Sequence, residues 1–455
     1  MNGYLLCAIA LFASYAAGRR SLVNGLQAVL TVGYFYGILR ANFFTTASHF
    51  IFDCAVLGLY VSRFQDLSQI FVTPDGQRLK HWVTLLMLIP LVMFFIPMQD
   101  ALVQLVGLRG HAFLLPFLII GARLRRDDFY RLGLWLACLN IAAFSVGCAE
   151  YLLGLEHFFP MNAVTELIYR SNDVGLSNDY RIPSIFGNAH AFGGTMVLTI
   201  PLIAGAWVQK QREIWHKNLF LAGMLAAMLG VFMSAARSHF LALAVLLLVA
   251  TLSTQIRPIY RVGWIVVLVL VGYVVGTHQR MQRFTTLNDR QFVEGRFEAS
   301  VNTTLLDAMI EYPFGVGLGG GGTSMPFFLM DRVNMPVAVE SEWGRIELET
   351  GLVGLAAWCG FLLWVFTRPQ ARRSDPSFLG LRLAWFACLT FFGFGFIGIG
   401  LFTSIPATAI FLMLVGWIST HHTGEADQPA RALNPGRHDS RVALALRQRA
   451  VAHRG

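Results

Sequence analysis

Charged side chains are scarce in this sequence, and their scarcity excludes a water-soluble globular protein. Only 13% of the 455 residues are Asp, Glu, Lys or Arg, whereas 55% are hydrophobic and the mean hydropathy is +0.57. Soluble domains carry about 25% charged residues, so this chain could not cover a surface that faces water. Lipid must therefore be its main solvent, in which only helices or a closed barrel pair every backbone group.

Cysteine is also sparse, and its placement excludes a disulfide framework or a zinc site. The six cysteines lie within or at the ends of apolar segments, at Cys7, Cys54, Cys138, Cys148, Cys359 and Cys388. None has the spacing of a zinc ligand set, so they are interpreted as small packing residues. No basic region precedes the first apolar segment, so residues 4–17 are expected to be a retained helix and not a cleaved signal peptide.

Long apolar runs make up most of the chain, and their continuity indicates helices. The runs do not alternate with polar residues and are about 20 residues long, the length at which a helix crosses a bilayer. The sequence therefore predicts an all-α polytopic membrane protein with about 12 or 13 transmembrane helices, the two counts differing in the first span. The predicted spans are residues 3–18, 22–39, 43–62, 82–98, 102–122, 129–150, 190–208, 218–236, 238–255, 262–277, 346–367, 379–398 and 402–420.

Positive charge is distributed unevenly between the two ends of these spans. The net charge is +9, and lysine and arginine gather in alternate short loops and after residue 420. Basic loops stay in the cytoplasm, so the long polar segments 151–189 and 277–345 are predicted to be outer loops. Residues 1–420 would then form a single membrane domain. Residues 421–455 would be a disordered, basic cytoplasmic tail that faces lipid headgroups and binds no nucleic acid.

The larger outer loop contains a predicted helix followed by a run of glycines. Apolar residues recur at helical spacing within 296–312, namely Phe297, Val301, Leu305, Ala308 and Met309. Pro313 ends this helix. The glycines within residues 315–322 permit positive φ angles and close backbone approach to a ligand. The run lacks the Lys-Ser/Thr ending of a P-loop and follows a helix, so nucleotide binding is rejected.

Two arginines lie close to predicted outer ends of spans. Arg237 stands in a tight turn between two spans, and Arg181 stands in the smaller outer loop just before a span. Each could be an ordinary interfacial charge, or it could grip a phosphate in bidentate fashion. Asn188 and His190 open the span after Arg181, where free N–H groups favour anions, although His190 could equally be a packed interfacial residue.

Acidic residues crowd the end of the larger loop. They are Glu340, Glu342, Glu347 and Glu349, with Arg345 among them. The spacing of Glu342, Arg345 and Glu349 puts them on one helical face, where simple ion pairing is the alternative to a function. Glu340 and Glu342 precede the predicted span, so either carboxylate could take a proton from an acceptor hydroxyl.

Four segments within residues 181–360 together carry a family resemblance. They are Arg181 with the following Phe-Gly-Asn-Ala-His-Ala-Phe-Gly, the Ser-Ala-Ala-Arg-Ser turn at Arg237, the stretch from Glu-Gly-Arg-Phe to Pro-Phe-Gly-Val-Gly-Leu-Gly, and Glu-Leu-Glu-Thr-Gly-Leu-Val-Gly-Leu at 347–355. In this order and topology they resemble the O-antigen ligase and polymerase family of bacterial inner-membrane glycosyltransferases. The first six spans match that family only in hydropathy.

The resemblance implies a metal-independent glycosyltransferase with a glycosyltransferase C-like membrane fold and no cofactor. Its donor would be an oligosaccharide on undecaprenyl diphosphate at the periplasmic face. Arg181 and Arg237 match the positions where the family places diphosphate-binding arginines, and Arg296, which matches a recurrent arginine, would bind the diphosphate with them. Arg345, Asn188 and His190 would support the site. A chain-length regulator and a flippase of the same pathway would be protein partners, besides membrane lipids.

Several functions stay open at this stage. Ligases of the family carry a histidine where this chain has Glu340, so a polymerase of repeat units is favoured over a ligase that moves a finished chain. A transporter would keep ionisable residues near the bilayer midplane and broken helices in paired repeats. The midplanes of the predicted spans are nearly free of charge, and Arg109 and His111 are the main exceptions. A structural scaffold would give no reason for Arg237 in an outer turn.

Overall fold

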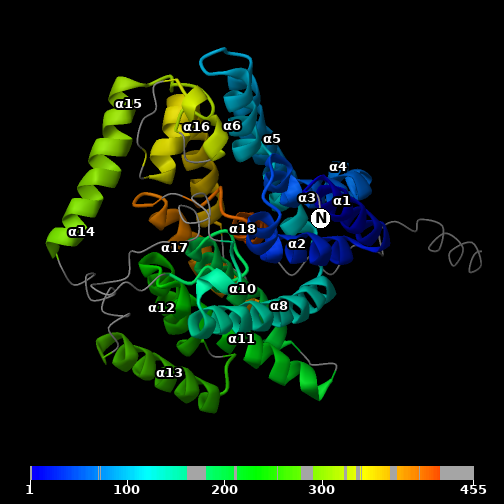
Figure 1. Ribbon diagram of the computed structural model, residues 1–455. Helices are drawn as coiled ribbons and strands as arrows, with labels where there is room; N and C mark the ends of the chain where they lie inside the picture. The colour runs from blue at the N-terminus through cyan, green and yellow to red at the C-terminus, as the bar shows by residue number, and fades with distance from the viewer. Residues whose placement is uncertain are drawn as a thin grey trace, which may run out of the picture.

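The computed structural model describes residues 3–69, 71, 73–160, 181–209, 213–253, 255–277, 290–321, 325–334, 339, 341–368, 377–398 and 400–420. These residues form a bundle of helices (Figure 1) and include no strand. In chain order the helices are α1 (Gly3–Arg20), α2 (Leu22–Asn42), η1 (Thr46–Phe50), α3 (Ile51–Ser62), α4 (Phe64–Ser68), α5 (Pro74–Phe94), α6 (Ala101–Ala112), α7 (Pro116–Arg123), α8 (Arg126–Leu153), η2 (Leu155–His157), α10 (Ala189–Val208), α11 (Ile214–Ser234), α12 (Arg237–Thr251), α13 (Pro258–Thr277), α14 (Arg290–Phe297), η4 (Glu298–Leu306), α15 (Asp307–Glu311), η5 (Phe327–Arg332), α16 (Glu342–Phe366), α17 (Phe378–Phe394) and α18 (Ala407–Thr420).

Six helical segments in the described part of the chain are long and apolar enough to cross a membrane. They are Leu22–Asn42, Ala101–Arg123, Arg126–Leu153, Ala189–Val208, Ile214–Ser234 and Glu342–Phe366. Shorter apolar helices of 10–17 residues are Thr46–Ser62, Arg237–Thr251, Pro258–Val267, Phe378–Phe394 and Ala407–Thr420. Every predicted span falls on an observed helix or on two consecutive helices. The prediction of an all-helical, membrane-embedded protein is thereby confirmed, while the side on which each loop lies stays a prediction.

Helix α10 lies at the centre of the bundle. It packs against α8, α11, α12, α17 and α18, and nearly all of its residues are buried. A chain of side-chain hydrogen bonds ties it to α2 and α8. The Tyr34 hydroxyl donates to Asn140 Oδ1 at 2.6 Å, and Asn140 Nδ2 donates to Thr199 Oγ1 at 2.9 Å. Buried polar groups need such partners, so this chain of bonds holds α10 in one position against its neighbours.

The segment of residues 181–188 is almost wholly buried and leads into α10. It packs so closely on α2 that a Cβ at Gly37 would lie 1.9 Å from the carbonyl carbon of Phe186. A hydrogen bond joins the same two segments, because the Ile38 N–H donates to the Ile185 carbonyl at 3.1 Å. Glycine at position 37 therefore allows two backbones to touch, and the entry to α10 is fixed relative to α2.

Helix α16 is interrupted at Gly351, which has φ 68° and ψ −176°. The break separates a fully buried first part from a second part that is partly exposed. The segment before α16 supplies the backbone partners at the break. The Val316 N–H donates to the Leu348 carbonyl at 2.7 Å, and the Leu352 N–H donates to the Pro313 carbonyl at 3.0 Å. The backbone groups freed by the break are thus satisfied within the protein.

The predicted loop helix is present and begins earlier than expected. Consecutive elements α14, η4 and α15 run from Arg290 to Glu311, and η4 is π-helical. The helix ends just before Pro313, as predicted. Leu305 and Ala308 are buried, in agreement with the apolar spacing. Figure 1 shows α14 along the outside of the bundle, with α15 next to α16. Its predicted periplasmic position is not tested by these contacts.

The glycine-rich segment approaches the protein's own helices. Gly315, Gly317 and Gly319 have positive φ angles of 75°, 92° and 82°, as the glycine run predicted. A Cβ at Gly317 would lie 2.7 Å from the Met98 Cβ, and a Cβ at Gly319 would lie 2.7 Å from Val103 Cγ1. Within the described part of the chain, these glycines therefore let the glycine-rich segment pack closely on α6 and on the loop before it. Ligand approach, the use expected from the sequence, stays a prediction.

We predict that Gly351→Ala destabilises the protein by about 1–3 kcal/mol, because alanine is strained at this φ. Its Cβ would also lie 2.8 Å from the carbonyl carbon of Phe314. Thermal unfolding of detergent-purified protein measures the effect. The matched control is Gly393→Ala in α17, where an added Cβ meets nothing within 4 Å. Equal unfolding temperatures for the two variants would contradict a structural role of the break.

Candidate functional site

The first turn of α10 is the centre of the candidate anion site. Asn188 is the N-cap, and its Oδ1 accepts a hydrogen bond from the Ala191 N–H at 2.8 Å. This bond satisfies one of the free N–H groups with which every helix begins. The sequence prediction that Asn188 stands at the start of a helix is confirmed. Its role is to cap the helix, so its effect on an anion would be indirect.

Arg181 and His190 contact each other beside this turn. Arg181 is buried, with 6% of its surface exposed, and its Nη1 lies 2.6 Å from His190 Nε2. Since arginine can only donate, Nε2 must be the unprotonated ring nitrogen that accepts. His190 itself is exposed. The pair therefore joins a buried guanidinium to an imidazole on the surface.

Arg237 begins α12 immediately after a turn of two residues. Ala235 is left-handed, with φ 49°, and ends α11, while Ala236 is the N-cap of α12. The tight turn predicted from the sequence is thus present. Arg237 is partly buried, and its guanidinium is carried at the positive end of the α12 dipole.

His239 connects the starts of α10 and α12. Its ring centroid lies 5.9 Å from that of His190. The ring also lies against two glycines of α10, because a Cβ at Gly193 would be 3.0 Å from Nδ1 and a Cβ at Gly194 would be 3.1 Å from Nε2. These glycines let the first turn of α12 approach α10 closely. Arg237, two residues before His239, is thereby brought to the same end of the bundle as Arg181.

A further arginine, Arg40, lies at the same place. It is in the last turn of α2, and a Cβ at Gly187 would lie 3.8 Å from its Nη2. Gly187 directly precedes the N-cap of α10. Arginines of α2, of the segment before α10 and of the first turn of α12 therefore lie at the end of the bundle where α10 and α12 begin. Such an arrangement can bind an anion with two or more charged oxygens.

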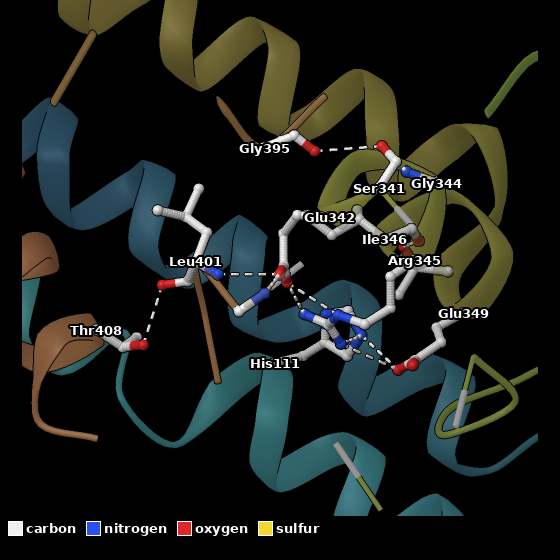
Figure 2. A network of polar contacts seen from close by, with 12 residues as sticks. His111, Ser341, Glu342, Gly344, Arg345, Ile346, Glu349, Gly395, Leu401 and Thr408 are labelled. Carbon is white, nitrogen blue, oxygen red and sulfur yellow. Dashed lines mark hydrogen bonds and ion pairs between the residues drawn. The ribbon is translucent and has the colours of Figure 1, made fainter. Parts of the chain in front are cut away.

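A second polar cluster lies at the start of α16, and here the charges are paired with one another (Figure 2). Arg345 Nε and Nη2 donate to Glu342 Oε1 at 2.9 and 2.6 Å. The other oxygen, Oε2, accepts from the N–H groups of Gly400 at 2.7 Å and Leu401 at 3.1 Å. These hydrogen bonds join the start of α16 to the segment before α18. Arg345 and Glu342 have 1% and 0% of their side chains exposed, so the pair is fully desolvated.

The cluster continues to α6 through Glu349. Its Oε2 lies 2.8 Å from His111 Nε2 and 3.4 Å from Arg345 Nη1. The ion pairing that the helical spacing predicts for Glu349 and Arg345 is therefore present, and Glu342, which was expected to meet a substrate, pairs with Arg345 as well. Arg109, like His111, was predicted to be an ionisable residue inside a span. Its Nη2 lies 2.7 Å from Asp53 Oδ2, so it too is paired. These ionisable residues have acquired partners, as groups buried in a membrane require.

Glu342 and Arg345, both predicted site residues, lie in the second cluster, where they pair with each other. Glu342 accepts at both oxygens, which speaks for a structural role, and its role as a base stays a prediction. Helix α16 begins at Glu342, four residues before the predicted span, because the Ser341 hydroxyl caps it by accepting from the Gly344 N–H at 3.2 Å. Glu340 lies outside the described residues. Arg296 lies in α14, and its side chain is outside the described part.

Glu347 differs from its charged neighbours in α16. It is fully buried, and neither of its carboxylate oxygens has a hydrogen-bond partner among the described residues. An unpaired carboxylate is costly in such a place, and burial of this kind is typical of a group with a function. Within the described ranges, no three His, Cys, Asp or Glu residues gather as a metal site would require.

Sequence reasoning missed Arg40, His239 and Glu347. His239 stands two residues after Arg237, so its nearness in the sequence could have marked it. Arg40 lies in a predicted outer turn, but nothing in the linear sequence connects it with position 187. Glu347 could not be separated from Glu349 without knowledge of which face of α16 finds partners.

Comparison with known proteins does not identify the function of this site. No family model matches the chain, and no curated protein matches its sequence. The function must therefore be inferred from the side chains and their arrangement.

We predict that Arg345→Ala destabilises the protein by about 3–5 kcal/mol, because it leaves the carboxylate of Glu342 buried without its cation. Thermal or denaturant unfolding in detergent measures the loss. Glu347→Gln is the matched control on the same buried turn, since it removes no partner that the described residues provide. It should leave stability unchanged or raise it. A similar loss of stability in both variants would show that the ion pair is not what stabilises this segment.

Proposed function

We propose that this chain is a polytopic membrane glycosyltransferase of the O-antigen ligase and polymerase type. Its apolar runs of about 20 residues give 12 or 13 spans in this proposal. In this proposal it joins oligosaccharide repeat units carried on undecaprenyl diphosphate at the periplasmic face of the inner membrane. One observation carries the proposal. His190, which contacts Arg181, lies beside His239, which follows Arg237 by two residues in the first turn of α12, so the starts of α10 and α12 meet at one end of the bundle.

This arrangement fits a lipid diphosphate headgroup. The prenyl chain would lie in the bilayer and present the diphosphate at the level where α10 and α12 begin. Guanidinium groups bind phosphate oxygens with charge-assisted, bidentate hydrogen bonds. The two helix N-termini add partial positive charge at the same level. The site would thus recognise the carrier rather than the sugar.

The proposed reaction forms one bond and breaks one bond. A hydroxyl oxygen of the acceptor unit attacks the anomeric carbon of the donor chain, and the bond from that carbon to the diphosphate oxygen breaks. The diphosphate leaves with the electron pair, and a carboxylate accepts the hydroxyl proton. Arg181 and Arg237 neutralise the negative charge that grows on the leaving diphosphate, each by about 3 kcal/mol of transition-state stabilisation. The activated bond itself supplies the driving force.

Glu340 is the proposed proton acceptor, as the sequence predicts. The described residues on either side support a fixed position for this part of the chain. Ser341 caps α16, and Glu342 is tied to Arg345 and to the backbone at Gly400. A carboxylate next to such an anchored helix start would be held in place relative to an acceptor. Glutamate at this position, where family ligases have histidine, favours polymerisation over ligation.

A transporter of lipid-linked sugars is the second candidate, because two segments are broken near buried charges. The apolar segment Ala101–Arg123 is divided into α6 and α7, and α16 is interrupted at Gly351. His111 at the end of α6 contacts Arg345 in α16. Discontinuous helices with buried ionisable groups are typical of transporters. The paired state of these charges, however, gives them a stabilising role without any transported ligand.

We predict that Arg181→Ala and Arg237→Ala each abolish long-chain polysaccharide. Each loss should lower the rate by about 100-fold or more. Polymer is measured in a deletion strain complemented with each variant, with membrane levels of the protein checked by immunoblotting. The control is Arg126→Ala, which removes an exposed arginine at the start of α8. Full-length polymer from the double variant Arg181→Ala/Arg237→Ala would refute the proposed diphosphate clamp.

The lipid intermediates of a deletion strain should distinguish the candidate functions. We predict that single lipid-linked repeat units accumulate on the periplasmic side, because their transfer to one another is blocked. Extraction and mass spectrometry of the lipid fraction measure this. Accumulated long lipid-linked polymer would instead indicate a ligase. Units that stay protected from a glycosidase added to the periplasm would indicate a transporter.

A further inference from the structure

The helical run made of α14, η4 and α15 ends in three exposed apolar side chains. Leu306, Ile310 and Phe314 have 45%, 78% and 82% of their surface exposed. Leu306 and Ile310 lie four residues apart and so share one side of the helix, and Phe314 follows in the turn after α15. We call these three side chains the apolar surface of α15. A surface of this kind marks a contact with lipid or with another protein.

The other sides of α15 have different surroundings. Ala308 belongs to a buried cluster with Leu348 of α16, so one side of α15 packs against that helix. Asp307 and Glu311 are exposed and lie four residues apart on another side. The helix thus has a buried side, an apolar exposed side and an acidic exposed side. An arrangement of separate apolar and charged exposed sides is typical of a helix at a membrane interface.

The apolar surface of α15 adjoins α16 at the point where that helix is interrupted. A Cβ at Gly351 would lie 2.8 Å from the carbonyl carbon of Phe314. The Leu352 N–H donates to the Pro313 carbonyl at 3.0 Å. The next residue of α16, Val353, is 67% exposed. Phe314 is therefore beside the first exposed side chains of the second part of α16, and the two share the same surrounding solvent.

The length of the second part of α16 indicates what this solvent is. Helix α16 is one of the segments long and apolar enough to cross a membrane. Its second part has only fifteen residues, Leu352 to Phe366, and so covers about 22 Å of a hydrocarbon layer about 30 Å thick. Arg368, which pairs with Asp75 just beyond the end of α16, marks one edge of that layer. The break at Gly351 then lies several ångströms inside the other edge, and the solvent there is lipid.

The beginning of the helical run is suited to water instead. Arg290 Nε lies 2.6 Å from Glu294 Oε1, and both side chains are largely exposed. An exposed ion pair of this kind is stable in water and costly in lipid. The run from Arg290 to Glu311 is about 33 Å long at 1.5 Å per residue. It is therefore long enough to lead from the aqueous side into the edge of the bilayer.

We propose that Leu306, Ile310 and Phe314 form a lipid-binding face, which seats the end of this helical run in the bilayer beside α16. The ligand is the acyl chains of the surrounding membrane lipids. The acidic side with Asp307 and Glu311 faces the headgroups and the water beyond them. Part of the predicted outer loop 277–345 is then a membrane element. This inference goes beyond the proposed function and does not depend on it.

Photocrosslinking of the full-length protein in phospholipid nanodiscs tests the lipid contact. p-Benzoylphenylalanine replaces Ile310 or Phe314, and lipid adducts are measured by mass spectrometry after irradiation. The matched controls are the same replacements at Asp307 and Glu311, on the acidic side of α15. Adducts at the apolar positions should exceed those at the acidic positions by about 10-fold, the preference expected for a large apolar side chain that leaves water. The same replacement at Leu363, an exposed residue in the second part of α16, gives the yield of a lipid contact.

The same variants are also irradiated in cell membranes, where a protein partner would be present. Equal lipid yields at Ile310, Phe314, Asp307 and Glu311 would place the apolar surface in water and overturn the proposal. Crosslinks to a second copy of the chain or to another protein, without lipid adducts, would overturn it too. Unfolding temperatures are compared with that of the wild type, and the two apolar positions are independent, so a folding defect at one leaves the other to decide.

Discussion

The backbone contact between α2 and the segment before α10 is the constraint on which the candidate site depends. Glycine at position 37 removes the side chain that would otherwise separate the two segments, and a hydrogen bond from Ile38 to Ile185 fixes their register. On the other side, the Ser184 N–H donates to Glu150 of α8 at 2.9 Å. Arg181, Arg40 and the cap of α10 take their positions from these contacts. The site is thus rigid because its backbone is packed.

The charged side chains have different surroundings at the two polar sites. At the start of α16, Glu342, Arg345 and Glu349 satisfy one another and hold α6, α16 and the segment before α18 together. At the start of α10, by contrast, the buried guanidinium of Arg181 contacts the imidazole of His190. Mutual pairing of buried ions favours structure, because their desolvation is offset within the protein. A guanidinium near a helix N-terminus adds to the positive end of the helix dipole, and both would stabilise an anion bound there.

The two regions together are consistent with chemistry at the level of the lipid headgroups. In the proposed function, a donor on a prenyl carrier is confined to the bilayer, so the protein would need only to fix its diphosphate and present an acceptor. Arginines suit this task because they stay charged at a membrane surface. The break of α16 at Gly351 places a buried, polar turn next to the apolar remainder of the helix. A polar reaction site and a membrane anchor can thus follow one another in a single segment.

The sequence by itself determined that the chain is a helical membrane protein and where its helices lie. Apolar runs of the length that crosses a bilayer must be helical, since lipid offers no partner to the backbone, and each predicted span coincides with observed helix. Local spacing also predicted a helix over residues 296–312, within the observed run from Arg290 to Glu311 and its end, and the pairing of Arg345 with Glu349, because both depend on contacts within a few residues. The tertiary structure alone decided the rest. Arg40 meets Gly187, and His190 meets His239, only because glycines at positions 37, 193 and 194 let separate helices touch. Such contacts depend on how distant segments pack, and no local pattern in the chain records them.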